Sequence, residues 1–268
     1  MKRLIIIALN VVVATALHAT PDRIEINGEE PIITRVNQRD EGKLLSQTVT
    51  IKMTDRRGKI QERKLQFFRK DYSGERKSVI FYQSPANVKG TAFLTFDYAS
   101  KEKEDNQWLY LPALRKTRRI SAANRGDYFL GTDLTYEDVK LGTKIGANDY
   151  NFETIRKDVY EGNSVTVIKG IPVTDKIAKE LGYGKVEYTI DNARNIPLKI
   201  EYWDIAGNTL KVIHFKDVKK IQGIWTVQRM EAENFKTQHK TTLLFEEQDY
   251  QTPLDEQLFT EESLVRGL

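Results

Sequence analysis

Residues 107–138 read QWLYLPALRKTRRISAANRGDYFLGTDLTYED. The stretch begins with an unbroken apolar run, Trp108 to Leu111, and successive side chains of a β-strand point to opposite faces of the sheet. Such a run therefore predicts a strand that is covered on both faces, and the pattern recurs at Phe67-Phe68, Val79 to Tyr82 and Phe93-Leu94. Two interpretations stay open. Either helices cover one face and ordinary packing fills the other, or a curved sheet encloses an unfilled apolar space.

The chain on both sides of this stretch is predicted to be mainly β. Segments rich in β-branched and aromatic residues alternate with turn-forming residues such as Asp55 to Gly58 and Ser84-Pro85. The predicted strands include Gln47–Thr54, Lys64–Arg69, Ser78–Gln83, Ala92–Tyr98, Val165–Ile168, Val186–Ile190, Leu198–Tyr202, Leu210–Ile213, Ile224–Glu233 and Lys240–Glu246. Their short connections indicate an antiparallel meander, and one continuous sheet is the simplest account.

Three helical segments are predicted within this β pattern. Apolar spacing places one amphipathic helix within Asp22–Glu41. Val173–Leu181 contains the N-cap candidate Thr174 at its start and ends at Gly182, as expected for a short inserted helix. Thr260–Arg266 is predicted to form a terminal helical turn.

The N-terminus predicts export. Met1–Ala19 contains Lys2 and Arg3, an apolar run shorter than the roughly 20 residues of a membrane span, and small residues at Ala16 and Ala19. Cleavage is expected after one of these alanines, which leaves residues 20–268 as a single β domain in the periplasm. Because the chain has no cysteine, we expect neither a lipid anchor after the signal nor a disulfide.

Composition indicates neither nucleic-acid binding nor a particular chemistry. The chain has 42 Lys and Arg against 38 Asp and Glu, and loss of Lys2 and Arg3 leaves 40 against 38, a net charge of +2. His214 and His239 lack a second ligand at metal-binding spacing, so no metal or cofactor is predicted. The sequence contains neither a Gly-x-Ser-x-Gly elbow nor a phosphate-binding glycine loop. We predict that the protein is not an enzyme; a hydrolase using two distant carboxylates is the weaker alternative, for which no pair is indicated.

Two motifs carry a family resemblance. WLYLPALRKTRRI at Trp108–Ile120 and DYFLGTDLTYEDV at Asp127–Val139 resemble the signature of the outer-membrane lipoprotein-sorting protein family, a branch of the LolA-like superfamily of periplasmic carriers. The resemblance implies a strongly curved antiparallel sheet, a half-open, incomplete barrel of about eleven strands with a few lid helices. It also implies a cavity that accepts acyl chains, since each buried CH₂ group contributes about 0.8 kcal/mol.

The resulting prediction is a soluble, monomeric periplasmic carrier that shuttles a lipid or lipoprotein between membranes. One alternating set of strand residues is predicted to line its cavity: Val49, Ile51, Met53, Phe67, Phe81, Phe93, Trp108 and Tyr110. The opposite parity, with Phe68, Tyr82, Leu94 and Leu109, is the competing choice, because a shift of one residue exchanges the faces of a strand.

A basic cluster is the candidate contact for a lipid headgroup or a partner. It comprises Arg115, Lys116, Arg118 and Arg119, of which the three arginines are predicted to make the contact because a guanidinium group can bind phosphate in two places. A solvated hairpin edge with local ion pairs is the alternative. A different class of function is also open, namely a non-enzymatic accessory subunit of a resistance-nodulation-division type exporter.

Overall fold

The computed structural model describes residues 30–100 and 103–268. The chain divides into a short N-terminal unit, Met1–Pro31, and a second unit, Ile32–Leu268, that contains all the elements below. The predicted signal Met1–Ala19 and the first part of the helix predicted in Asp22–Glu41 lie outside the described residues. Among the described residues, no helix is both long and apolar enough to cross a membrane.

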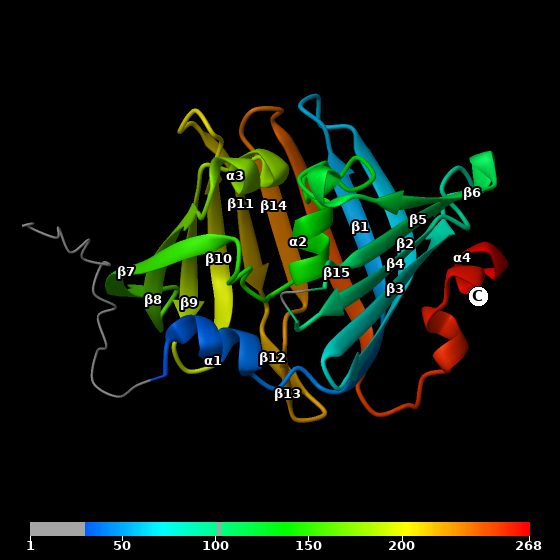
Figure 1. Cartoon of the computed structure of the whole chain (residues 1–268), viewed down its shortest axis with the longest axis horizontal. Helices are drawn as coiled ribbons and strands as arrows, with labels where there is room; N and C mark the ends of the chain where they lie inside the picture. Colours follow the sequence, from blue (N-terminus) through cyan, green and yellow to red (C-terminus); the bar gives the residue numbers. More distant parts are fainter. Residues whose placement is uncertain (1–29, 101–102) are drawn as a thin grey trace, which may run out of the picture. The chain divides into compact units, whose positions relative to one another are not determined.

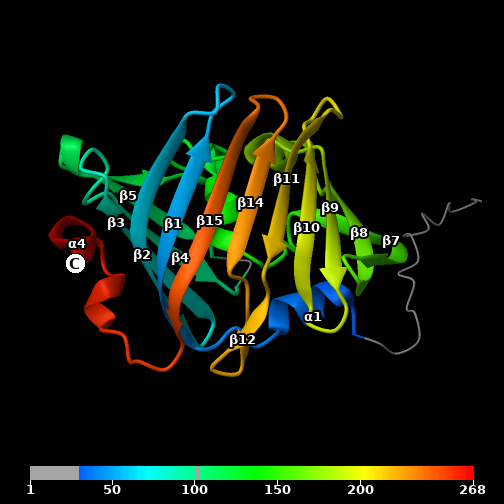
Figure 2. The same cartoon turned by 180° about the vertical axis from the view of Figure 1, so that it is seen from behind.

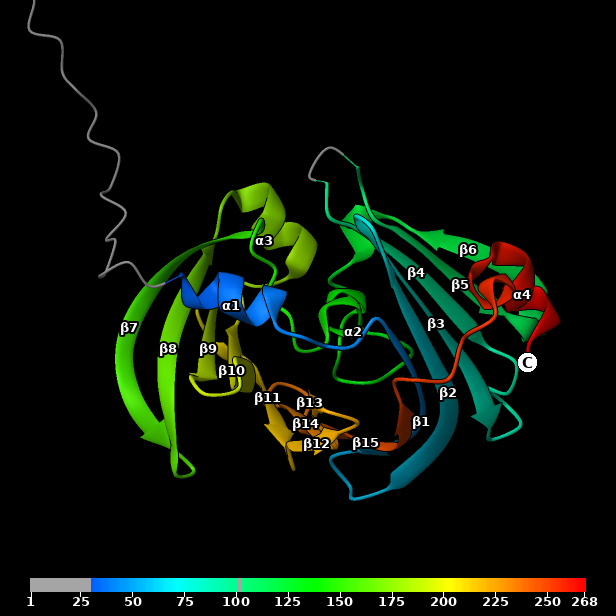
Figure 3. The same cartoon turned by 90° about the horizontal axis from the view of Figure 1, so that it is seen from below.

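The main element is one antiparallel sheet of 13 strands in the order β6-β5-β4-β3-β2-β1-β15-β14-β11-β10-β9-β8-β7. The strands are β1 (Leu44–Thr54), β2 (Ile60–Tyr72), β3 (Glu75–Ser84), β4 (Ala92–Tyr98), β5 (Asn106–Leu111), β6 (Lys116–Ile120), β7 (Tyr150–Tyr160), β8 (Asn163–Pro172), β9 (Lys185–Asp191), β10 (Ile196–Trp203), β11 (Thr209–Lys216), β14 (Arg229–Asn234) and β15 (His239–Asp249). The sheet is strongly curved and its edge strands, β6 and β7, are not paired with each other in the described chain (Figures 1 and 3). The predicted half-open barrel is confirmed, with 13 strands where about eleven were implied.

Two meanders meet in the middle of this sheet. Strands β1 to β6 follow one another from the centre to one edge, and β7 to β15 return from the other edge to the centre. The pairing of β1 with β15 joins them, for example at Val49 opposite Phe245. The predicted strand Ile224–Glu233 is divided, because Ile224–Thr226 (β13) pairs instead with Lys219–Ile221 (β12) in a separate two-stranded ribbon.

The helices are short, and α3 has the cap residues that the sequence predicts. Helix α1 spans Ile32–Gln38, α3 spans Asp175–Leu181 and α4 spans Glu261–Arg266. The Thr174 hydroxyl accepts the backbone N–H of Ile177 at 3.2 Å, and Gly182 ends α3 in the left-handed conformation with φ of 76°. The short 3₁₀ helix η3 (Glu256–Phe259) precedes α4.

Residues 121–149, here called the crossing segment, connect β6 at one edge to β7 at the other. The segment contains the 3₁₀ turn η2 (Ala122–Asn124) and helix α2 (Tyr136–Leu141). Figures 1 and 3 show α2 inside the concave face, whereas α4 lies outside β3 to β5; Figure 2 shows the strands from behind. Helix α2 begins with a capping box, in which Thr135 and Asp138 bond each other's backbone N–H groups.

Three apolar clusters explain why adjacent strand residues are both apolar. On the concave side, one cluster joins β1 to β5 with the crossing segment through Phe129 and Tyr136, and another joins α1 to β8–β11 and β14. On the outer side, Phe259 and Leu264 cover Val79, Phe81 and Leu94. Helical segments therefore cover both faces of β3 to β5.

Candidate functional site

A cavity of about 200 Å³ lies between the concave face and the crossing segment. Its apolar lining is supplied by β1 to β3, the crossing segment, β14 and β15, and includes Leu45, Val49, Ile51, Leu65, Phe67, Ile80, Phe129, Leu134, Val139, Met230, Leu243 and Phe245. Its polar lining includes Arg39, Glu41, Arg69, Arg76, Thr143, Thr226 and Tyr250. One cavity thus combines an apolar wall with a group of buried charges.

Three of the eight residues predicted to line the cavity do so: Val49, Ile51 and Phe67. Met53 and Phe93 lie in the same concave cluster beside the cavity, where the ring centroids of Phe93 and Phe129 are 5.0 Å apart. Their contact with a lipid stays a prediction.

The structure corrects the prediction for the other three, Phe81, Trp108 and Tyr110. They do not line this cavity but pack in the outer cluster against η3 and α4. Strand register is the reason. Phe67 and Phe93 are opposite Ile80, and Phe93 is also opposite Leu109, so these partners share the concave face. The competing parity set is mixed as well, because Tyr82 and Leu109 face inward while Phe68 and Leu94 face outward.

The predicted contact residues Arg115, Arg118 and Arg119 are exposed at the edge strand β6 and its preceding turn, away from the cavity lining. Arg119 donates to the side-chain oxygen of Asn106. Because Arg118 is opposite Leu109 and Arg119 opposite Trp108, the two guanidinium groups leave the strand on different faces. Their role in contact with a headgroup or partner stays a prediction.

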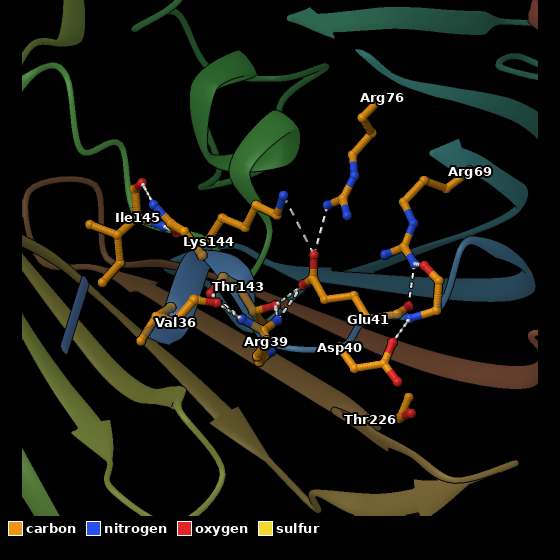
Figure 4. A network of polar contacts seen from close by, with 12 residues as sticks. Val36, Arg39, Asp40, Glu41, Arg69, Arg76, Thr143, Lys144, Ile145 and Thr226 are labelled. Atoms are coloured by element: carbon orange, nitrogen blue, oxygen red, sulfur yellow. Dashed lines mark hydrogen bonds and ion pairs between the residues drawn. The ribbon is translucent and has the colours of Figure 1, made fainter. Parts of the chain in front are cut away.

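A buried ionic network, shown in Figure 4, forms one end of the cavity. The Glu41 carboxylate pairs with Arg39, with Arg76 at 2.8 Å and with Lys144 at 3.9 Å. Burial alone would raise the pKa of Glu41, but the surrounding cations, including Arg69, hold it well below its ordinary value. Glu41 is therefore a buried anion whose charge is required by its neighbours.

The same network fixes the backbone that leads from α1 into β1. Arg69 donates to the carbonyls of Glu41 and Gly42, and Arg39 donates to the carbonyl of Val36 at 2.9 Å. Gly42 adopts φ of 73°, and a Cβ there would lie 2.6 Å from the Tyr250 ring. Sequence reasoning missed this network because its partners come from four separate segments, and the one local signal is the charged run Arg39 to Glu41.

A second buried network anchors the crossing segment to β11 and β15. Asp138 forms an ion pair with the fully buried Lys211, whose ammonium group also donates to the carbonyl of Asp133 at 3.1 Å. The Asp133 carboxylate accepts from Thr241 at 2.7 Å and lies 2.6 Å from His239 Nδ1. Acidic residues of the signature motif therefore hold the segment in the concave face.

A third group of ion pairs secures the ends of the crossing segment. Arg125 binds both carboxylate oxygens of Asp149 at 2.9 Å and reaches Glu180 at 3.3 Å. Lys140, within the same segment, pairs with Asp105 at 2.6 Å. In residues 30–100 and 103–268, no group of three or more His, Asp or Glu side chains is arranged to hold a metal ion.

The open, curved antiparallel sheet with an inserted helix is similar to the fold of several solved structures. An outer-membrane lipoprotein-sorting protein domain from Vibrio parahaemolyticus is 29% identical with a TM-score of 0.79, and the match covers 88% of this chain and 97% of that domain. A DUF1329 family protein from Desulfovibrio piger is 24% identical with a TM-score of 0.78, covering 87% and 96%. A LolA superfamily protein from Nitrosomonas europaea is 17% identical with a TM-score of 0.63, covering 86% and 96%.

A family model with the description "Uncharacterized protein" matches residues 74–266. The chain belongs to this family, and its fold is similar to that of the outer-membrane lipoprotein-sorting, DUF1329 and LolA superfamily structures above. The comparison with curated proteins gives no match.

Proposed function

We propose that this protein is a periplasmic, non-enzymatic carrier that binds acyl chains of a lipoprotein or another lipid and shuttles them between envelope membranes. The observation that supports this best is the apolar cavity between the concave face and the crossing segment. Each CH₂ group moved from water into such a site contributes about 0.8 kcal/mol, so an acyl chain gains most of its binding free energy without any bond being broken. Release to an acceptor requires the same interactions to be reversible.

Native mass spectrometry tests this proposal directly. The chain is expressed with its own N-terminus, purified gently from the periplasm, weighed under native conditions and then extracted for lipid. We expect a stoichiometric lipid or acylated protein. Failure to find any, also after incubation with envelope lipids, would overturn the carrier proposal.

A matched pair of variants tests whether the cargo binds in the cavity. Val49→Phe places a ring in the cavity lining and should reduce the bound lipid severalfold, because that volume is no longer available. Val159→Phe introduces the same change at a position that is 70% exposed on β7 and should leave the lipid content unchanged. Equal lipid content in both variants would place the cargo elsewhere.

The exposed edge strand β6 favours a second candidate, an accessory subunit of a resistance-nodulation-division type exporter. Four consecutive residues from Lys116 to Arg119 are exposed there, and an edge strand offers unpaired backbone groups to a partner. Capture of such an exporter together with a lipid-free extract would support this candidate over the carrier.

Charge reversal tests the basic cluster in either case. Arg118→Glu with Arg119→Glu should slow transfer of cargo between donor and acceptor membranes while the unfolding midpoint stays unchanged, because both side chains are exposed. Wild-type transfer by the double variant would show that the cluster makes no functional contact.

A further inference from the structure

The concave face of β1 to β3 changes from charged to apolar along the strands. Neighbours across the sheet define successive rows: Asp71 with Arg76, then Leu45 with Arg69 and Ser78, then Gln47 with Phe67 and Ile80, then Val49 with Leu65 and Tyr82. Arg69 and Leu65 are separated by four residues, which corresponds to about 13 Å along a strand. The cavity follows this gradient, since its lining contains members of all four rows.

The charged end of the cavity carries more guanidinium groups than carboxylates. Arg39, Arg69 and Arg76 line it together with one carboxylate, Glu41, whereas Asp71, the second partner of Arg76, lies outside the lining. The other lining acid, Asp138, is paired with Lys211. The charged end of the cavity therefore carries a net positive charge.

Two of these arginines have a buried Nε donor that makes no hydrogen bond. Arg69 is 8% exposed and the Arg39 side chain 7%, and within the described chain neither Nε has a hydrogen-bond partner, although the Arg69 Nε lies 3.7 Å from the Asp71 carboxylate. A buried polar group without a partner costs about 1–3 kcal/mol, and more when it is charged. Burial lowers the pKa of both guanidinium groups, and the nearby cation Arg76 lowers it further.

We infer that the cavity takes an anionic amphiphile, with a carboxylate or phosphate headgroup bound by Arg39 and Arg69 and an acyl chain along the apolar rows toward Ile51 and Leu65. This inference rests on the proposed carrier function and adds the class of headgroup. A guanidinium group presents a planar set of donors that matches a carboxylate or a phosphate. The hydroxyl groups of Thr226 and Tyr250 lie 2.9 Å apart in the same lining and bond each other, so they form a polar wall beside the two guanidinium groups.

The test compares ligands that share one chain and differ in the head. Binding of hexadecanoate, hexadecyl phosphate and the neutral hexadecanol to the purified protein is measured by calorimetric titration at pH 7.5, with inorganic phosphate as the chain-free probe. We expect both anions to bind at least tenfold more tightly than hexadecanol, and inorganic phosphate to bind far more weakly than hexadecyl phosphate.

Each alternative result has a distinct meaning. Equal affinity for hexadecanol and the two anions would overturn the anionic headgroup and leave the carrier proposal standing. Binding of none of the three long-chain ligands would overturn both. Binding of inorganic phosphate as tight as that of hexadecyl phosphate would overturn the amphiphile and indicate a plain anion site.

A variant then locates the headgroup. Arg69→Gln should reduce affinity for the anions to that for hexadecanol and leave hexadecanol binding intact, whereas Arg156→Gln, the same change on the exposed part of β7, should retain the preference. Because Arg69 also holds the backbone at Glu41, its folding is checked by urea unfolding. If Arg69→Gln does not fold, the headgroup preference of the wild type still decides the inference. A folded Arg69→Gln protein with an undiminished preference would contradict the assignment.

Discussion

At the residue scale, the buried charges beneath the crossing segment determine most of what is specific to this molecule. Glu41 is enclosed by Arg39, Arg69, Arg76 and Lys144, so removal of its charge leaves four cations facing one another. Removing one partner from a buried ion network lowers the free energy of unfolding by on the order of 3–5 kcal/mol, far more than the loss of an exposed pair.

Glu41→Gln should therefore lower the free energy of unfolding at pH 7 by roughly 3–5 kcal/mol. The folded-state pKa of Glu41 is lowered, so its contribution is fully present above the unfolded pKa of about 4.3 and is lost as pH falls toward the folded value. The difference between wild type and variant should shrink below about pH 4. Urea unfolding at pH 7, 5 and 3.5 measures it.

The matched control is Glu62→Gln, an exposed acid of β2 that lies 3.8 Å from Lys52. It should change stability by less than about 1 kcal/mol at every pH. A Glu41→Gln effect as small as that of the control, or one that grows in acid, would contradict the proposed role of the buried charge.

Residue patterns predicted that the strands are covered on both faces, but they could not predict which residues share a face. That choice depends on the register between strands, which places Ile80 rather than Phe81 opposite Phe67. The ionic network was equally hidden, because Arg69 and Thr143 are 28 and 104 residues from Glu41 and Arg39, their respective partners. Only the fold brings these side chains together.

At the element scale, predictions succeeded where a local signal exists. Thr174 and Gly182 cap α3 as the sequence indicates, and the predicted terminal turn forms as α4. Helix α2 was missed because six residues are too short to show helical periodicity, although Thr135 and Asp138 form a recognisable capping box. Strand β7 was missed because its burial pattern is almost entirely exposed, so it lacks the apolar alternation of a half-buried strand.

Gly126 allows the crossing segment to approach α3. A Cβ at this position would lie 2.5 Å from the Glu180 carbonyl oxygen and 2.7 Å from the backbone of Leu181, neither of which can move without shifting the helix. Gly126→Ala should therefore destabilise the protein by about 1–3 kcal/mol, as in other overpacked sites. Thermal unfolding and hydrogen exchange across residues 121–149 measure the effect.

Gly146→Ala in the same segment is the control. Its Cβ would meet its nearest neighbours at 3.5 Å, an ordinary contact, so we expect no loss of stability and a gain of up to about 1 kcal/mol from the stiffer unfolded chain. If the two alanine variants behave alike, close approach to α3 is not what Gly126 provides.

At the scale of the whole molecule, the crossing segment and the sheet are separate layers, so the proposed carrier function does not require strand pairs to break. The sheet runs without interruption from β6 to β7, and the crossing segment lies within its concave side as a separate layer. The cavity of about 200 Å³ is smaller than the roughly 300–1,000 Å³ of typical small-molecule sites. Under the proposed carrier function, we expect the crossing segment to move away from the strands when a long acyl chain is loaded.

The anchor on β15 should set how often that movement occurs. The Thr241 hydroxyl donates to the Asp133 carboxylate at 2.7 Å and accepts the Asp133 backbone N–H at 3.0 Å, so Thr241→Val removes both bonds at nearly constant volume. Loss of buried hydrogen bonds costs about 1–3 kcal/mol, which corresponds to roughly 5- to 150-fold more frequent opening. Amide exchange in residues 129–141 should accelerate by that factor, and release of bound lipid should accelerate with it. Thr242→Val, on the other face of the same strand, should change neither rate. Faster exchange throughout the sheet as well as in the crossing segment would mean that the segment opens only by global unfolding, and a carrier that loads through this segment would then need another route into its cavity.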